Sequence, residues 1–161
     1  MEMIIGGAYQ GKTEYARKQY PQLRWSDGGS VTEEELMNAQ GVIGFQQYIR
    51  SELENGKDVS DLAEKIICKN PDIVLVSQEV GYGVVPVDAF DRKYREAVGR
   101  VCTKLAAYSH KVTRVICGIG TVIKMIKLWL IRHGKQKGIN FPDISAQRMS
   151  RYGQEGTEFS A

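Results

Sequence analysis

Short apolar runs alternate with amphipathic segments along most of the chain. We expect strands at four apolar runs, which are residues 3–5, 22–25, 73–76 and 115–117. Apolar residues recur at helical spacing in three longer segments, and we expect helices at residues 12–20, 58–70 and 88–108. Strands that alternate with helices in this way predict an α/β fold with an open, mostly parallel sheet flanked by helices.

The segment between the second and third expected strands has the pattern of one long helix. Thr32 and Glu35 have the spacing of a capping box, which marks a helix start. An apolar stripe then continues through Leu36, Ala39, Ile43, Tyr48, Ile49 and Leu53. Gly41 and Gly44 fall inside this helix and each weakens it by about 1 kcal/mol relative to alanine.

Length and composition favour one globular domain. The chain has 161 residues, of which 42% are hydrophobic and 25% charged. No apolar run approaches the roughly 20 residues of a membrane span, and no secretory signal is visible. Cys68, Cys102 and Cys117 lie far apart in apolar surroundings, so we expect reduced, buried thiols and a cytoplasmic protein.

The positive charge of the chain comes from its end. Residues 126–161 hold six basic and three acidic residues, which leaves 16 of each in the preceding residues. The net charge of +3 therefore arises in the tail. A body without excess positive charge argues against a nucleic acid as partner.

The first apolar run leads into a phosphate-loop motif. It matches G-x-x-x-x-G-K-[ST] in full, with the residues Gly6, Gly7, Ala8, Tyr9, Gln10, Gly11, Lys12 and Thr13. Backbone amides of such a loop, together with the positive end of the next helix, bind phosphate oxygens. Lys12 would reach the β- and γ-phosphates of ATP or GTP, and the Thr13 hydroxyl would bind Mg²⁺.

A second candidate group follows the buried run at residues 73–76. Ligands of open α/β sheets bind beyond the carboxyl ends of the strands, and Glu79 comes directly after this run. Its carboxylate could bind Mg²⁺ through water or orient the acceptor, which makes it a candidate catalytic and metal-binding residue. The alternative is a solvated loop acid.

Two blocks of sequence carry a resemblance to a known family. They are the phosphate loop from Ile5 to Thr13 and the stretch from Val76 to Lys124, which includes EVGYGVVP and the closing Gly118-Ile119-Gly120. The chain resembles the bifunctional adenosylcobinamide kinase / adenosylcobinamide-phosphate guanylyltransferase family of cobalamin biosynthesis. The resemblance implies a P-loop NTPase-like sheet over residues 1–124 and a homotrimer.

The resemblance also implies two reactions. In the first, a nucleoside triphosphate phosphorylates the hydroxyl group of the cobinamide side chain, and in the second, GMP passes from GTP to that phosphate. Lys12, Thr13 and Glu79 match motif positions. Arg92, Arg95 and Arg100 match too and could neutralise phosphates or link subunits, although the alternative is an ordinary solvated helix face.

Two features of the family have weak counterparts in this sequence. The family carries GMP on a histidine between the phosphate loop and the third strand, whereas this chain has only His110 and His133. Glutamines stand near the corresponding place. Asp27 is a weak stand-in for an acidic residue after the second strand. For His110 we expect a role at the carboxyl end of the long helix, where a positive charge interacts favourably with the helix dipole.

Residues 125–161 form a separate extension. Its start, from Ile126 to Gly134, resembles the first strand and Arg-His-Gly motif of the histidine phosphatase family, to which a ribazole-phosphate phosphatase belongs. The 27 residues after Gly134 are too few for the core of such a domain, so we expect a truncated, partly disordered stub.

The sequence thus predicts a kinase that uses ATP or GTP with Mg²⁺ and acts on a cobinamide-type corrinoid, with GMP transfer from GTP to the resulting phosphate as a possible second activity. A non-catalytic nucleotide- or corrinoid-binding relic of the family is the alternative from another class, because the histidine is missing. A kinase for an unrelated small alcohol is a third possibility.

Overall fold

The structure is a computed structural model that describes residues 1–81, 83 and 86–126. The chain divides into a unit of Met1–Ile126 and a second unit of Lys127–Ala161. The predicted boundary at residue 124 stays a prediction, and the phosphatase-like stub with His133 lies outside the described residues. Along the first unit the elements are β1 (Glu2–Gly6), α1 (Lys12–Gln19), β2 (Trp25–Asp27), α2 (Glu33–Asn38), β3 (Gly41–Ile43), α3 (Phe45–Glu54), α4 (Leu62–Lys69), β4 (Val74–Gln78), α5 (Ala89–Tyr108), β5 (Lys111–Ile116) and β6 (Ile119–Met125).

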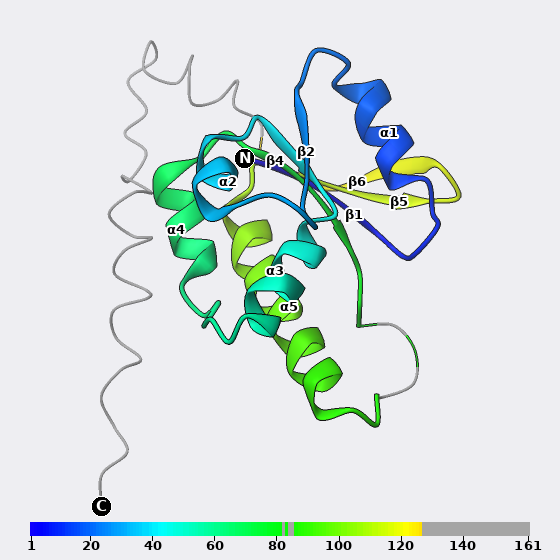
Figure 1. Ribbon diagram of the computed structural model, residues 1–161. Helices are drawn as coiled ribbons and strands as arrows, with labels where there is room; N and C mark the ends of the chain where they lie inside the picture. Colours follow the sequence, from blue (N-terminus) through cyan, green and yellow to red (C-terminus); the bar gives the residue numbers. More distant parts are fainter. Residues whose placement is uncertain (82, 84–85, 127–161) are drawn as a thin grey trace, which may run out of the picture. The chain divides into compact units, whose positions relative to one another are not determined.

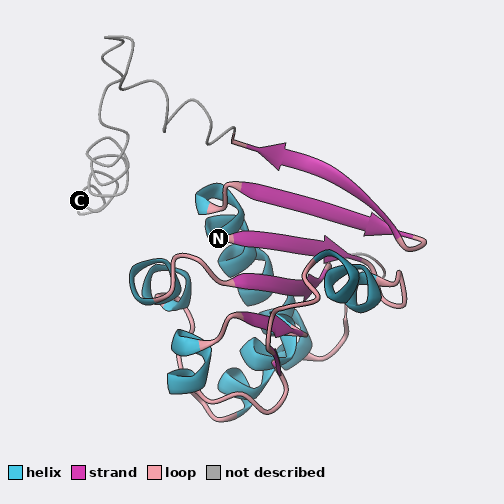
Figure 2. Cartoon of the chain, turned by 90° about the horizontal axis from the view of Figure 1, so that it is seen from above, coloured by secondary structure: helices cyan, strands magenta, loops and turns pink. Residues whose placement is uncertain are grey.

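The strands form one six-stranded sheet in the order β2-β3-β4-β1-β5-β6. The first five are parallel to their neighbours, and β6 is antiparallel to β5. Figure 2 shows the strands side by side. This arrangement confirms the predicted fold class, an open and mostly parallel α/β sheet flanked by helices. It also brings the carboxyl ends of β1 to β5 to one edge.

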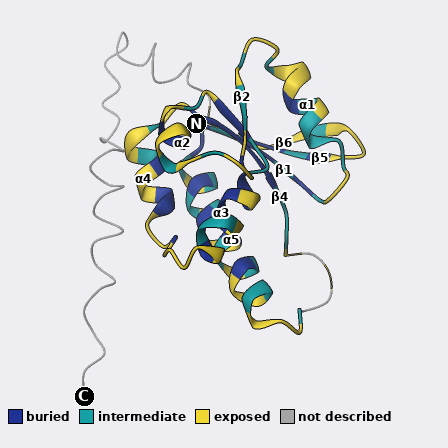
Figure 3. Cartoon of the chain, in the orientation of Figure 1, coloured by how far each residue is buried: buried dark blue, intermediate teal, exposed yellow. Residues whose placement is uncertain are grey.

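The sheet separates two apolar cores, because successive side chains of a strand point to opposite faces. Met3 and Leu75 belong to the larger core, which lies between the sheet and α2 to α5. Ile4 and Val76 belong to a smaller core under α1. In Figure 1, α1 accordingly lies apart from the other helices, with the sheet between them, and Figure 3 shows the buried sides of α3 and α5.

The prediction of a single helix between Thr32 and Leu53 is wrong. The capping box is present, with Thr32 Oγ1 accepting from the Glu35 amide, but α2 ends at Asn38. Residues 41–43 form β3, because Val42 is fully buried when it pairs with Leu75 of β4. Gly44, at a φ of 75°, then begins α3. The apolar residues with helical spacing thus belong to three elements, α2, β3 and α3. Pairing of β3 with the sheet determines its structure in spite of that spacing.

Other expectations differ in detail. The second strand begins at Trp25, where residues 22–25 were expected, and α4 begins at Leu62 rather than near Asp58. The antiparallel strand β6 was not expected at all. Its exposed side chains include Ile119, Ile123 and Met125.

The three cysteines are free, as expected, but two of them are not buried. Cys68 and Cys117 are exposed and Cys102 is partly buried. Burial raises the pKa of the Cys102 thiol to about 11, and a hydrogen bond with Ser77 opposes this shift.

Candidate active site

The phosphate-loop motif lies between β1 and α1. Gly6 is the last residue of β1 and Lys12 the first of α1. Gly11 caps the helix in the left-handed conformation, with a φ of 79°. The first amides of a helix have no intrahelical acceptor, so the first turn of α1, which includes Thr13, directs N–H groups and the positive end of the helix dipole toward the loop. This is the local geometry that an anion site requires.

Lys12 folds back over the start of the loop. Its Nζ donates a hydrogen bond of 2.7 Å to the Gly7 carbonyl. A Cβ atom built on Gly6 would lie 3.3 Å from the Lys12 methylene groups and 2.4 Å from the Val115 carbonyl oxygen, so residue 6 has room only for glycine. Burial lowers the pKa of Lys12, whereas the charge of Glu79 opposes this effect. The lysine cation is thus held at the mouth of the loop and near a carboxylate.

The middle of the loop is exposed and bent. Ala8 and Tyr9 are exposed, and Tyr9 has a φ of 57°, which is unusual for a residue other than glycine. Gln10 turns the other way, toward β5 and β6. Its side-chain oxygen accepts from the Cys117 amide at 2.7 Å, and its carbonyl oxygen accepts from the Gly118 amide at 2.9 Å.

Glu79 lies directly beyond β4 and next to the phosphate loop. Its amide donates a 2.9 Å hydrogen bond to the Gly6 carbonyl, which extends the β1–β4 pairing by one residue. Its carboxylate accepts from Arg114 Nε at 3.2 Å, and its side chain is only 18% exposed. The alternative of a solvated loop acid does not fit this position.

Arg114 is a site residue that the sequence reasoning missed. It lies in β5 opposite Ile5 of β1, and its ion pair with Glu79 crosses over the end of β1. A signal was available, because an arginine is unusual inside an apolar strand that ends at a ligand-binding edge. The Glu79 carboxylate thus pairs with Arg114 and is also close enough to Lys12 to affect its pKa.

Asp27 ends β2 at the same edge of the sheet. Its Oδ1 accepts from the Gly29 amide at 3.1 Å. β3 and β4 separate β2 from β1, so the two strands are three spacings, or roughly 14 Å, apart. Asp27 therefore lies on the flank of the edge rather than beside the phosphate loop.

A buried glutamine contacts the end of β4. Gln46 lies in the first turn of α3, and its side chain is buried, with 9% of the residue exposed. Its Oε1 accepts a 3.0 Å hydrogen bond from the Gln78 amide. A neutral amide held in this way cannot carry a nucleotidyl group, for which an imidazole nitrogen is needed.

The three predicted arginines of α5 separate into two kinds. Arg92 donates to the Pro86 carbonyl at 3.0 Å and also to the Val87 carbonyl, and Arg95 donates to the Gly81 carbonyl at 2.6 Å. Both thus bind backbone of the segment that follows Glu79. Arg100 instead pairs with Glu96 at 2.5 Å, and its side chain is 77% exposed.

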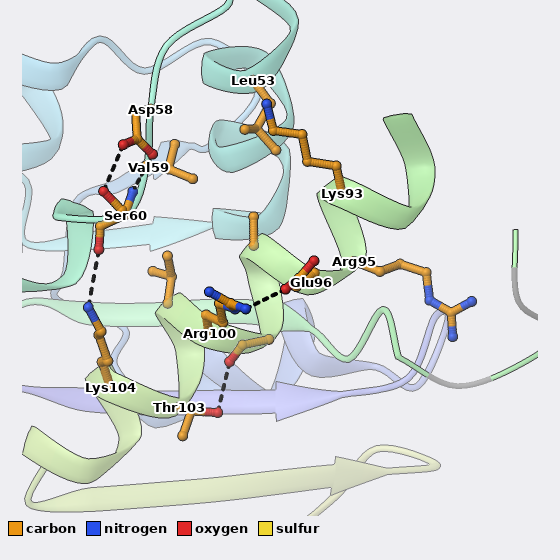
Figure 4. A pocket seen from close by; sticks show the side chains of 13 residues that line it. Leu53, Asp58, Val59, Ser60, Lys93, Arg95, Glu96, Arg100, Thr103 and Lys104 are labelled. Atoms are coloured by element: carbon orange, nitrogen blue, oxygen red, sulfur yellow. Dashed lines mark hydrogen bonds and ion pairs between the residues drawn. The ribbon is translucent and has the colours of Figure 1, made fainter. Parts of the chain in front are cut away.

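A hollow of about 730 Å³ lies between α5 and the turn before α4. Figure 4 shows Arg95 extending away from the other labelled side chains. Lys104 donates to Ser60 and Glu64, and Arg100 pairs with Glu96, so these cations of the hollow are already paired. None of the lining residues belongs to the phosphate loop.

The polar contacts of the His110 ring are with Glu2 and the amino group of Met1, and its expected role at the end of α5 stays a prediction. The helix ends at Tyr108, and the His110 Nε2 lies 3.3 Å from Glu2 Oε1 at the opposite edge of the sheet from the phosphate loop. Across residues 1–81, 83 and 86–126, no cluster of three or more histidine, cysteine or acidic side chains could hold a metal ion. Within the same residues no helix is long and apolar enough to cross a membrane.

Comparison with known proteins assigns the fold to a family. The model of the family "Cobinamide kinase / cobinamide phosphate guanyltransferase" (CobU) matches residues 29–123, which is more than half of the chain. The chain belongs to the CobU family. The match includes Asp88 and the whole of α5, and it begins after the phosphate loop.

Two curated relatives match a shorter stretch. The chain is 46% identical over 52 residues to the bifunctional adenosylcobalamin biosynthesis protein CobU of Escherichia coli (strain K12). It is equally similar to the protein of that name from Salmonella typhimurium (strain LT2). Each match covers 32% of this chain and 29% of the relative. The chain thus spans less than a third of the length of these curated relatives.

Proposed function

We propose that this CobU-family chain transfers the terminal phosphoryl group of ATP or GTP to the hydroxyl group of a cobinamide-type corrinoid. The observation that supports the proposal most directly is the junction of the phosphate loop with Glu79. The Glu79 amide binds the carbonyl of Gly6, the first motif residue, so a cation and a carboxylate lie around one strand end. Membership of the family supports the substrate class.

The chemistry asks for positioning and charge rather than a covalent intermediate. The acceptor hydroxyl oxygen forms a bond to the γ-phosphorus, the bond between that phosphorus and the β–γ bridging oxygen breaks, and ADP or GDP leaves. Lys12 would stabilise the charge on the β- and γ-phosphate oxygens. Glu79 would accept the hydroxyl proton, while Arg114 holds its carboxylate at 3.2 Å.

The donor set at this edge suits Mg²⁺. The candidate groups, the Thr13 hydroxyl and the Glu79 carboxylate, are oxygen donors, which Mg²⁺ prefers. Mg²⁺ is held by few protein groups together with phosphates and water, so a cluster of three side chains is not required. Thr13 and Glu79 would hold the ion, which would supply positive charge to the triphosphate when bound.

The proposal does not include guanylyl transfer. No histidine occurs between residues 14 and 76, and the Gln46 oxygen is bound by the Gln78 amide. The same observation favours a second candidate, a nucleotide- or corrinoid-binding protein without catalysis. The homotrimer that the resemblance implies stays a prediction, which sedimentation would test.

The first experiment measures ADP or GDP release with cobinamide as acceptor. We expect turnover by the natural chain and a loss of about 100-fold or more in kcat/KM for Lys12→Ala, because a cation aimed at the transferred group is removed. Lys18→Ala, on the exposed side of α1, is the matched control and is expected to keep full activity. Equal turnover by Lys12→Ala and the natural chain would refute the proposal.

Two further outcomes decide between the candidates. Nucleotide binding without product release identifies the non-catalytic protein. Incubation with labelled GTP tests guanylyl transfer, and we expect no acid-labile label on the protein. Acid-labile label would show that another group replaces the missing histidine.

A further inference from the structure

The turn between β5 and β6 directs its amides at the phosphate loop. Cys117 and Gly118 form a two-residue hairpin connection between the paired residues Ile116 and Ile119. Their φ angles are 50° and 79°, and a type I′ turn needs positive values at both positions. The amides of the two central residues are not used in the ladder of such a hairpin, so they need other acceptors.

Gln10 supplies both acceptors. Its side-chain Oε1 binds the Cys117 amide at 2.7 Å, and its own carbonyl oxygen binds the Gly118 amide at 2.9 Å. One residue of the phosphate loop thus accepts both amides of the turn. Gln10 has left-handed neighbours on each side, Tyr9 at a φ of 57° and Gly11 at 79°, so the bonds fix the most bent part of the loop.

Close packing reinforces this contact. A Cβ atom on Gly11 would lie 3.2 Å from the Gly118 Cα atom, so the two backbones nearly touch. Further along, a Cβ atom on Gly120 would lie 2.2 Å from the Tyr15 ring, which therefore lies directly on the backbone of β6. The loop and the first turns of α1 rest on the hairpin at successive points.

We propose that Gln10 is a positioning residue, through which the β5–β6 turn holds the phosphate loop in the shape that binds a nucleoside triphosphate. The inference rests on the proposed function. A loop released from the turn gains other conformations, and the triphosphate must then select one of them, which weakens binding. Gln10 faces the turn rather than the reacting atoms, so its loss raises KM and leaves kcat nearly unchanged.

The test replaces Gln10 by methionine, which keeps the length of the side chain and removes the acceptor. We expect the Kd for ATP or GTP, measured by calorimetry with the full chain, to rise about five- to tenfold, as the loss of one hydrogen bond predicts. We expect faster hydrogen exchange at the Cys117 amide, which loses its acceptor. Gln19→Met is the matched control, because Gln19 is exposed at the end of α1.

The outcomes separate this inference from the proposed function. An unchanged Kd in Gln10→Met, with binding by the natural chain, would overturn the positioning role alone. A fall in kcat with an unchanged KM would overturn it as well, because Gln10 would then act in the chemical step. Failure of the natural chain to bind any purine triphosphate would overturn both proposals. Similar melting temperatures for Gln10→Met and Gln19→Met, with a raised Kd only in Gln10→Met, would support the positioning role of Gln10.

Discussion

The strands β1 and β5 hold charged side chains at both of their ends, but in different ways. At the amino end, the Glu2 carboxylate accepts a hydrogen bond from Tyr20 and lies 3.2 Å from Lys111 and 3.3 Å from His110. Lys111 also donates to the Tyr20 hydroxyl at 3.1 Å. Each group at this end has a partner of complementary charge or polarity.

The carboxyl end is paired in a different way. The Lys12 ammonium binds a neutral carbonyl, that of Gly7, and burial lowers its pKa. The nearby Glu79 carboxylate pairs with Arg114 at 3.2 Å, and a cation whose hydrogen bond goes to a neutral carbonyl gains from an incoming anion. The amino end is thus paired internally, and the proposed triphosphate site is at the carboxyl end.

Gly6→Ala is expected to have the largest effect on this comparison. The added methyl group would lie 2.4 Å from the Val115 carbonyl oxygen and would push β1 from β5. We expect the free energy of unfolding in urea to fall by about 1–3 kcal/mol, and triphosphate binding to weaken as Lys12 moves. Gly7→Ala is the matched control, since its methyl group would meet Gln10 at an ordinary 3.5 Å. If the free energy of unfolding fell equally in both variants, the steric argument would be contradicted.

Glu2→Gln tests the amino end through pH. Burial raises the pKa of Glu2, but the hydrogen bonds from Tyr20 and Lys111 lower it more, so the net shift is downward. Glu2 therefore makes its whole contribution to the free energy of unfolding above the usual glutamate pKa of 4.5. This contribution is lost as the pH falls through the lowered pKa of Glu2 in the folded chain. We expect the variant to lose about 1–2 kcal/mol of unfolding free energy at pH 7 and to approach the natural chain as pH falls below the lowered pKa of Glu2.

Glu14→Gln is the matched control for Glu2→Gln. Glu14→Gln changes an exposed carboxylate of α1, 4.0 Å from Arg17, and we expect its stability to follow that of the natural chain at each pH. Triphosphate affinity at pH 7 should not change in Glu2→Gln. A tenfold loss of affinity would show that the two ends of the sheet are not separate in function.

Arg100→Ala is expected to have the smallest effect. Its pair with Glu96 is exposed, and such pairs contribute little, so we expect a change within about 0.5 kcal/mol in unfolding free energy. Triphosphate affinity is also expected to stay the same. If calorimetry showed a tenfold weaker affinity, phosphate binding would extend to α5, and the carboxyl end would not be the whole site.

The elements that sequence predicted well have strong local signals. β1 leads into a complete phosphate-loop motif, β4 is a continuous apolar run, and Asp88 caps α5 through a 3.0 Å bond from the Asp91 amide. These signals do not depend on distant residues. The position of Glu79 followed from the rule that ligands bind beyond strand ends, and the structure places it beside Gly6.

The parts that sequence missed depend on distant partners. β3 is three residues long and becomes a strand through pairing with β2 and β4. The β5–β6 turn lacks the Asn-Gly or Asp-Gly pair typical of such hairpins, and Cys117 adopts a positive φ where Gln10 binds its amide. Arg114 can pair with Glu79 only because β4 and β5 lie on the two sides of β1, and this strand order is not visible in the sequence.

The strand order also has a consequence for biosynthesis. β1 is made well before its two neighbours in the sheet, which are β4, beginning at Val74, and β5, beginning at Lys111. A nascent chain on the ribosome cannot complete the sheet around β1 before residues 111–116 have emerged, and long-range pairing of this kind slows folding. β1 thus gains both of its native neighbours only after most of this unit has been made, and until then chaperones would meet its apolar side chains uncovered.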